Sequence, residues 1–183
     1  MKHFLLIGLC LFMASPAFAE SAEYSHQGLY FELGGGKNLG DQSGYNPTPA
    51  GTVIDVGYSF DPQWSAQLQW LDITSETKLT AIATTEDRIL PEIKWTPFIG
   101  VVQPYALAGV GMSFQTVTDD SGEGHLIPPQ NYSYFDMMLG AGAHTNFKSF
   151  INIFVEAHCN VIFVTSGITA STVPLFGGIQ LDI

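Results

Sequence analysis

The sequence predicts an all-β fold, an eight-stranded antiparallel up-and-down transmembrane β-barrel. Polar and apolar residues alternate along eight segments, which is typical of strands with two different faces. Long polar loops alternate with tight turns between these segments, as in bacterial outer-membrane barrels. Hydrophobic residues make up 46% of the chain and charged residues only 13%, about half the charged share of a soluble domain. This composition favours a chain whose surface faces a membrane.

The most regular alternation lies between residues 150 and 164. Its odd-numbered positions, such as Ile153 and Val155, are all apolar, whereas the even-numbered positions include Glu156 and His158. A period of two is that of a strand and not of a helix. The segment is also long enough for a transmembrane strand.

The other seven strands are predicted from the same pattern. They cover residues 29–36, 52–60, 64–73, 87–97, 104–115, 133–147 and 173–183. Polar loops are expected at 37–51, 74–86, 116–132 and 165–172, and tight connections follow the second, fourth and sixth strands. Proline cannot donate a hydrogen bond to a neighbouring strand, so Pro91 predicts a bulge in the fourth strand.

The first 19 residues are predicted to be a cleaved signal peptide. Lys2 and His3 precede an apolar run at 4–13, and Ala17-Phe18-Ala19 is a cleavage site of the A-x-A type. Residues 20–183 are then the barrel domain, exported to the outer membrane of the cell.

The charge balance excludes some partners. The chain has six Lys and Arg against seventeen Asp and Glu, and the leader removes one lysine, so the mature net charge is 5 minus 17, or −12. Nucleic acid and anionic membrane surfaces are therefore unsuitable partners.

Alternation alone does not distinguish a membrane barrel from a soluble barrel. The polar face is poor in charge and rich in Gly, Ser, Gln, Asn and Tyr, which suits a crowded lumen better than a solvated exterior. The apolar face carries aromatic residues near both strand ends, which predicts two girdles facing lipid. The girdle residues are Phe60, Trp64, Trp95 and Phe147 at the tight-turn end and Trp70, Phe114, Phe135 and Phe163 at the loop end.

Charged residues on the polar face are expected to form a network in the lumen. Eight strands enclose only enough space for side chains, so Arg88 and Lys94 are expected to bridge carboxylates of neighbouring strands. A gated ion path is the alternative use of this network. The predicted lumen residues are Glu32, Asp55, Arg88, Glu92, Lys94, Asp136, His144, Glu156, His158 and Asp182. No cofactor or metal is predicted, because the acidic segment 119–125 lacks the spacing of a calcium loop.

Several segments carry a family resemblance. The leader, SFDPQWS (59–65), QPYALAGVGMSF (103–114) and the strand-like C-terminus resemble the small outer-membrane barrels of the opacity and outer-membrane-protein-A type. The resemblance implies outer-membrane lipid and the outer-membrane assembly machinery as partners. Such barrels usually end in an aromatic residue that is recognised during assembly, whereas this chain ends in Ile183.

The sequence thus predicts a non-enzymatic barrel that displays polar loops for envelope integrity or for contact with an extracellular ligand or host surface. One alternative is a lipid A-modifying enzyme, because His158-Cys159-Asn160 faintly resembles the H-x-S-N motif of outer-membrane lipid A deacylases. The serine is absent, however, and alternation places His158 in the lumen and Cys159 towards lipid. The other alternative is a soluble periplasmic carrier of a hydrophobic ligand.

Overall fold

The computed structural model describes residues 27–38, 50–77, 82–119, 128–146, 150–163 and 169–183. Within these ranges the chain forms strands and connections, and no helix there is long and apolar enough to cross a bilayer. The strands are β1 (Gly28–Asn38), β2 (Ala50–Ser59), β3 (Trp64–Thr77), β4 (Ile82–Trp95), β5 (Val102–Asp119), β6 (Gln130–Thr145), β7 (Ile151–Phe163), β8 (Thr169–Thr172) and β9 (Pro174–Asp182).

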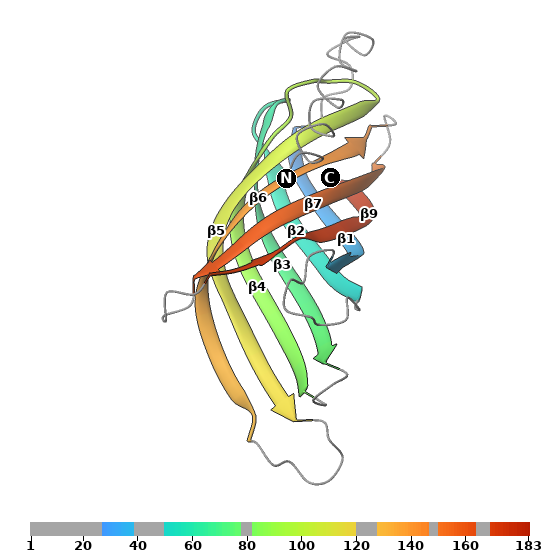
Figure 1. Cartoon of the computed structure of the whole chain (residues 1–183). Coiled ribbons are helices and arrows are strands. Elements are labelled where there is room, and N and C mark those ends of the chain that lie inside the picture. The colour runs from blue at the N-terminus through green and yellow to red at the C-terminus, as the bar shows by residue number, and fades with distance from the viewer. Residues whose placement is uncertain (1–26, 39–49, 78–81, 120–127, 147–149, 164–168) are drawn as a thin grey trace, which may run out of the picture.

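The strands close into one antiparallel barrel (Figure 1). Each strand from β1 to β7 pairs with the next, and β9 pairs with both β1 and β7. The short strand β8 pairs with β7 beyond the end of β9, so β8 and β9 together fill the eighth strand position. The predicted eight-stranded up-and-down barrel is therefore confirmed. The prediction of a loop over 165–172 was wrong for its last four residues, which form β8.

The apolar residues face outwards and the polar residues face the lumen. In β7, Ile153 and Val155 are 56% and 50% exposed, whereas Glu156 and His158 are each 1% exposed. The same alternation of exposed and buried residues runs along the other strands. A soluble carrier needs the opposite arrangement, with an apolar interior and a polar exterior, so that alternative is wrong.

Six strands are longer than predicted at the loop end: β1 and β2 by two residues each, and four others by three to five residues. β3 continues to Thr77, β4 begins at Ile82, β5 continues to Asp119 and β6 begins at Gln130. The added segments lie in what the sequence predicted to be loops, because they are mostly polar, rich in Thr, and lack an apolar face. The backbones of β3, β4, β5 and β6 remain paired in these segments. Because the segments have no apolar face, the sequence pattern did not predict them as strands.

The bulge predicted at Pro91 is absent. Ile89 pairs with Met112 and Glu92 pairs with Gly109, so both strands advance by three residues between these pairs. Pro91 itself pairs with Leu68 of β3 but has no pairing partner on β5. The barrel accommodates the missing donor as a local gap in one ladder, without an extra residue.

The tight turn between β2 and β3 is fixed by one carboxylate. Asp61 Oδ1 accepts hydrogen bonds from the backbone nitrogens of Gln63 at 2.7 Å and Trp64 at 2.9 Å. Aspartate commonly stabilises turns in this way. The turn thereby fixes the position of Trp64, the first residue of β3 and a member of the aromatic girdle at the tight-turn end.

Candidate functional site in the barrel lumen

The structure places all the predicted lumen residues on the inner face of the barrel. Among them Glu32, Asp55, Arg88, Glu92, Lys94, Asp136, Glu156 and His158 are at most 3% exposed, while His144 and Asp182 are partly exposed. Charged groups this deeply buried are costly unless they are paired or hydrogen-bonded. Their partners therefore define what the lumen can do.

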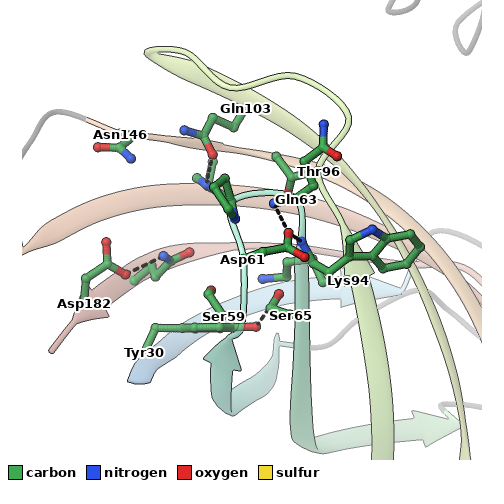
Figure 2. Close-up of a pocket in the computed structure, with 14 residues that line it drawn as sticks. Tyr30, Ser59, Asp61, Gln63, Ser65, Lys94, Thr96, Gln103, Asn146 and Asp182 are labelled. Carbon is green, nitrogen blue, oxygen red and sulfur yellow. Dashed lines mark hydrogen bonds between the residues drawn. The ribbon is translucent and has the colours of Figure 1, made fainter. Parts of the chain in front are cut away.

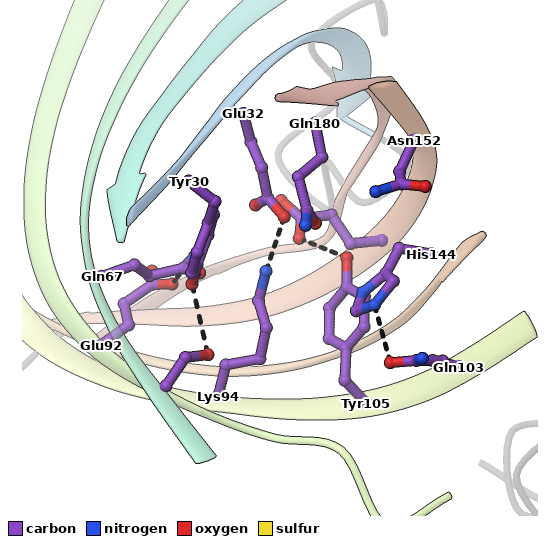
Figure 3. Close-up of polar contacts among 12 residues, drawn as sticks. Tyr30, Glu32, Gln67, Glu92, Lys94, Gln103, Tyr105, His144, Asn152 and Gln180 are labelled. Atoms are coloured by element: carbon purple, nitrogen blue, oxygen red, sulfur yellow. Dashed lines mark hydrogen bonds and ion pairs between the residues drawn. The ribbon is translucent and has the colours of Figure 1, made fainter. Parts of the chain in front are cut away.

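Lys94 is the centre of the half of the lumen nearer the tight turns. Its Nζ lies 2.7 Å from Glu32 Oε1. The same ammonium lies 4.9 Å from the ring centroid of Tyr30 and 4.6 Å from that of Tyr105, within the range of cation–π attraction. One carboxylate and two aromatic rings thus surround this cation (Figure 3).

Two glycines make room for these tyrosine rings. A Cβ atom at Gly57 of β2 would lie 2.2 Å from Cζ of Tyr30, and one at Gly142 of β6 would lie 2.5 Å from Cζ of Tyr105. Each ring therefore occupies space that a side chain on the adjacent strand would fill. The glycines on the lumen face position the rings around Lys94.

The Tyr30 hydroxyl continues the network towards β4. It donates to Gln67 Oε1 at 2.7 Å, and Gln67 Nε2 donates in turn to Glu92 Oε2 at 2.8 Å. This chain supplies Glu92 with a hydrogen-bond donor.

The Tyr105 hydroxyl supplies a donor on the other side. It donates to Glu156 Oε2 at 2.9 Å, and His158 Nε2 lies 3.1 Å from Glu156 Oε1. Glu156 therefore lies between a hydroxyl and an imidazole. The sequence did not single out Tyr30, Gln67 or Tyr105 as members of the network, although all three lie at lumen positions of the alternation.

Arg88 is the centre of a second cluster nearer the loops. Its Nε lies 2.9 Å from Glu86 Oε1, its Nη1 lies 3.4 Å from Asp136 Oδ2, and its Nη2 donates to Thr172 Oγ1 at 3.1 Å. The Ser113 hydroxyl also donates to Glu86 Oε1. The guanidinium thereby connects β4, β6 and β8. Glu86 and Thr172 were missed because both fell in predicted loops.

Apolar side chains fill much of the remaining lumen. One buried cluster consists of Val53, Leu71, Ile73, Phe154 and Phe176, and another of Leu90, Tyr105, Leu107 and Met138. Both clusters lie on the inner face of the barrel. The face that the sequence analysis described as polar therefore also contains large apolar side chains. The lumen is a packed interior that contains buried charges.

A small polar hollow opens at the tight-turn end (Figure 2). Its volume is about 30 Å³, on the scale of the space taken by one water molecule. His144 Nε2 lies 3.0 Å from Gln103 Oε1, and Asp182 accepts hydrogen bonds from Asn152 at 2.7 Å and Gln180 at 2.6 Å. Tyr30 and Lys94 line the same hollow. The hollow therefore reaches the group of buried residues around Lys94, here called the Lys94 cluster: Tyr30, Glu32, Asp55, Glu92, Lys94, Tyr105 and Glu156.

The aromatic residues predicted to face lipid lie on the outer surface. Phe60, Trp64, Trp70, Trp95, Phe114, Phe135 and Phe163 are all exposed, and Phe147 lies outside the described residues. Neighbouring rings contact each other at both ends of the wall: the centroids of Trp64 and Trp95 are 6.1 Å apart, and those of Phe135 and Phe163 are 5.9 Å apart. Ring pairs at these positions suit a membrane interface.

The geometry gives no support to the enzymatic alternative. His158 is buried in the lumen, whereas Cys159 is exposed on the outer face. A nucleophile and its base must lie within hydrogen-bonding reach of each other, and these side chains point to opposite sides of the wall. Within the described ranges, no group of three or more His, Cys, Asp or Glu residues is arranged to hold a metal ion.

A closed antiparallel barrel with an apolar outer wall, aromatic residues at both ends and a polar interior defines an outer-membrane barrel protein. The chain belongs to the outer membrane protein beta-barrel domain family, whose model matches residues 4–170. Its predicted location in the outer membrane and its predicted family resemblance are thereby confirmed.

Two crystal structures show the similarity of fold. Neisserial surface protein A matches with a TM-score of 0.66 and 11% identity, over 85% of this chain and 96% of that chain. The N-terminal β-barrel domain of Pseudomonas aeruginosa OprF matches with a TM-score of 0.55 and 12% identity, over 86% of this chain and 98% of that chain. A comparison with curated proteins finds no match.

Proposed function

We propose that this barrel is a non-enzymatic platform that contacts other molecules at the cell surface through the end opposite its tight turns. In bacterial outer-membrane barrels, short turns face the periplasm and longer loops face outwards. The observation that carries the proposal is that β3, β4, β5 and β6 continue beyond the aromatic girdle at the loop end, which consists of Trp70, Phe114, Phe135 and Phe163. The similarity of fold to a protein named as a surface protein accords with it.

The extended strands would give the outer end a rigid wall. β3 and β4 remain paired from Trp70↔Ile89 to Thr77↔Ile82, beyond the girdle residue Trp70. β5 and β6 remain paired from Phe114↔Ser133 to Val117↔Gln130. Binding groups on a rigid scaffold lose little conformational freedom when a partner binds. A paired sheet of four strands supplies such a scaffold beneath the loops.

The charge of the outer end indicates the class of partner. Asp72 and Asp87 pair across β3 and β4 just beyond Trp70, and burial, followed by the charge of Asp87, raises the pKa of Asp72. In the sequence, the segments that connect the strands at this end and the strand residues next to them contain, besides Glu86 in the lumen, Asp41, Asp72, Glu76, Asp87, Asp119, Asp120 and Glu123 against Lys37 and Lys78. The outer end is therefore acidic, and its partner is a positively charged surface or ligand.

Replacement of single loops tests this proposal. Residues 39–49, 78–81, 120–127 and 164–168 are each replaced by a short Gly-Ser linker in cells that carry the barrel, and binding of the cells to a cationic polymer surface and to host cells is measured. A linker at 147–149, on the periplasmic side, is the matched control. We expect at least one outer replacement to reduce binding, and binding to weaken as salt rises.

Two outcomes would contradict the surface role. Cells with the intact barrel could bind no better than cells without it, or every loop replacement could bind as the intact barrel does. Folding of each variant is checked by heat-modifiable migration on an unboiled gel. Increased permeability to antibiotics without any change in binding would instead assign the barrel to envelope integrity.

A further inference from the structure

The Lys94 cluster contains more buried carboxylates than it has cations. Glu32, Asp55, Glu92 and Glu156 all face the lumen and are at most 3% exposed. Lys94 forms its ion pair with Glu32. Because like charges repel strongly in a poorly solvated interior, four ionised carboxylates around one ammonium need further positive charge or hydrogen-bond donors.

The carboxylates differ in the donors that they receive. Glu92 accepts a hydrogen bond from Gln67, and Glu156 accepts one from Tyr105. Asp55 is different, because neither of its carboxylate oxygens meets a donor from any described residue, although both are fully buried. Oε2 of Glu32 also meets no donor within the described ranges. Oε1 of Glu92 lacks a donor as well, and Oε1 of Glu156 has only the imidazole of His158 beside it. Among these four residues, Asp55 alone lacks a donor at both carboxylate oxygens, and it is the ladder partner of Glu32.

Glu32 and Asp55 form a direct pair across two strands. Their Cα atoms are partners in the ladder between β1 and β2, and both side chains are buried on the lumen face. Side chains of directly opposite residues on one face of an antiparallel pair are close neighbours. Two ionised carboxylates can only accept hydrogen bonds, so no bond can form between them. A single proton turns one of them into a donor and satisfies both groups.

We propose that Glu32 and Asp55 share one proton, and that this buried acid site exchanges its proton with the periplasm. Glu32 keeps its bond to Lys94 through Oε1, and the proton lies between its Oε2 and the Asp55 carboxyl. The site is distinct from the outer end proposed to bind partners. It makes the lumen sensitive to pH on the periplasmic side of the membrane.

Other groups facing this pair do not provide the missing charge. The titratable groups on the surrounding strands nearer the tight turns are Tyr30 on β1, Glu92 and Lys94 on β4, Tyr105 on β5, His144 on β6, Glu156 and His158 on β7, and Asp182 on β9. His158 lies beside Glu156 and His144 beside Gln103. Lys94, the nearest cation, is already engaged by Glu32.

The polar hollow at the tight-turn end provides the route to the periplasm. Tyr30, Ser65 and Lys94 line it (Figure 2), and Gln180 is a further lining residue. Towards the loops, Val53 of β2 and Leu71 of β3 are fully buried members of an apolar cluster. A proton therefore reaches Asp55 more readily from the tight-turn end than from the outer end.

Infrared spectroscopy of the folded full-length mature barrel in detergent tests the site directly. A protonated carboxyl has a C=O stretching band at higher frequency than carboxylate bands, and the band shifts to lower frequency in D2O. The spectrum of Asp55→Asn is subtracted from that of the native barrel at neutral pH. We expect a protonated-carboxyl band in this difference, and no such band when Asp87→Asn, a change on the outer wall, is subtracted instead.

The pH dependence of unfolding is the second measurement. The folded barrel holds a proton that the unfolded chain releases near neutral pH, so the unfolding temperature falls as pH rises. Asp55→Asn keeps a donor beside Glu32 without a titrating proton, and we expect a smaller fall in this variant. Absence of the band from the Asp55→Asn difference would overturn the proposal. Carboxylate bands at Asp55 that change when sodium replaces potassium would also overturn it, by showing a metal cation in place of the proton.

Discussion

Lys94 shows how one residue determines the chemistry of the lumen. Its ammonium is buried, yet it touches one carboxylate oxygen at 2.7 Å and the faces of two tyrosine rings. Attraction to these groups offsets the loss of hydration, which is otherwise prohibitive for a buried charge. The same contacts join β4 to β1 across the interior and to its neighbour β5, so this residue contributes to the stability of the closed barrel.

Removal of the Lys94 charge should destabilise the barrel. We expect Lys94→Met to lower the free energy of unfolding by about 3–5 kcal/mol, because Glu32 then remains buried without its cation. The measurement is the temperature at which the compact form is lost on unboiled gels. Lys37→Met, at the exposed end of β1, is the matched control. An unchanged unfolding temperature for Lys94→Met would show that the ion pair does not stabilise the fold.

Gly57 provides a second test at a single position. We expect Gly57→Ala to cost about 1–3 kcal/mol, the usual range for overpacking, because the added Cβ would overlap the Tyr30 ring. Denaturant unfolding followed by tryptophan fluorescence measures the change. Gly35→Ala is the control, since its Cβ would make only an ordinary contact at 3.6 Å. Equal stability of the two variants would show that the Tyr30 ring does not need the space left by Gly57.

At the scale of elements, β4 shows that a closed barrel tolerates proline inside a strand. The pairing of β4 with β3 is continuous through Pro91, whereas the pairing with β5 is interrupted at Leu90 and Pro91. Strand count and shear must remain consistent around a closed barrel, and the unchanged register on both sides of the gap meets this requirement. The cost of the proline is therefore local.

Restoring the missing donor should strengthen this strand. We expect Pro91→Val to stabilise the barrel by about 1 kcal/mol, the usual net value of one hydrogen bond, because the register already aligns β4 with β5. Hydrogen exchange of the amides flanking the gap, together with thermal unfolding, measures the effect. Leu68→Val changes the neighbouring lipid-facing side chain without changing a donor and is the control. Lower stability of Pro91→Val would indicate that the backbone there is fitted to proline.

At the scale of the whole molecule, closure depends on the last strand position. β9 pairs with both β1 and β7, and the backbone nitrogen of Ile183 donates to the carbonyl of Leu29 at 2.9 Å. The Ile183 side chain itself is 73% exposed. Ile183 therefore takes part in closure through its backbone, while its side chain lies on the surface.

The sequence by itself determined which side chains face inwards, because a period of two is a local property of every strand. It also determined the strand number. It did not determine the length of every connection, since the predicted loop 74–86 is reduced to residues 78–81 by the extension of β3 and β4. It did not determine that Lys94 pairs with Glu32, which is 62 residues away, or that Arg88 contacts Thr172 in β8. Those contacts depend on how strand tilt and stagger align distant positions around the barrel. Only the tertiary structure therefore decided which buried charges are paired, and that Asp55 meets no donor among the described residues.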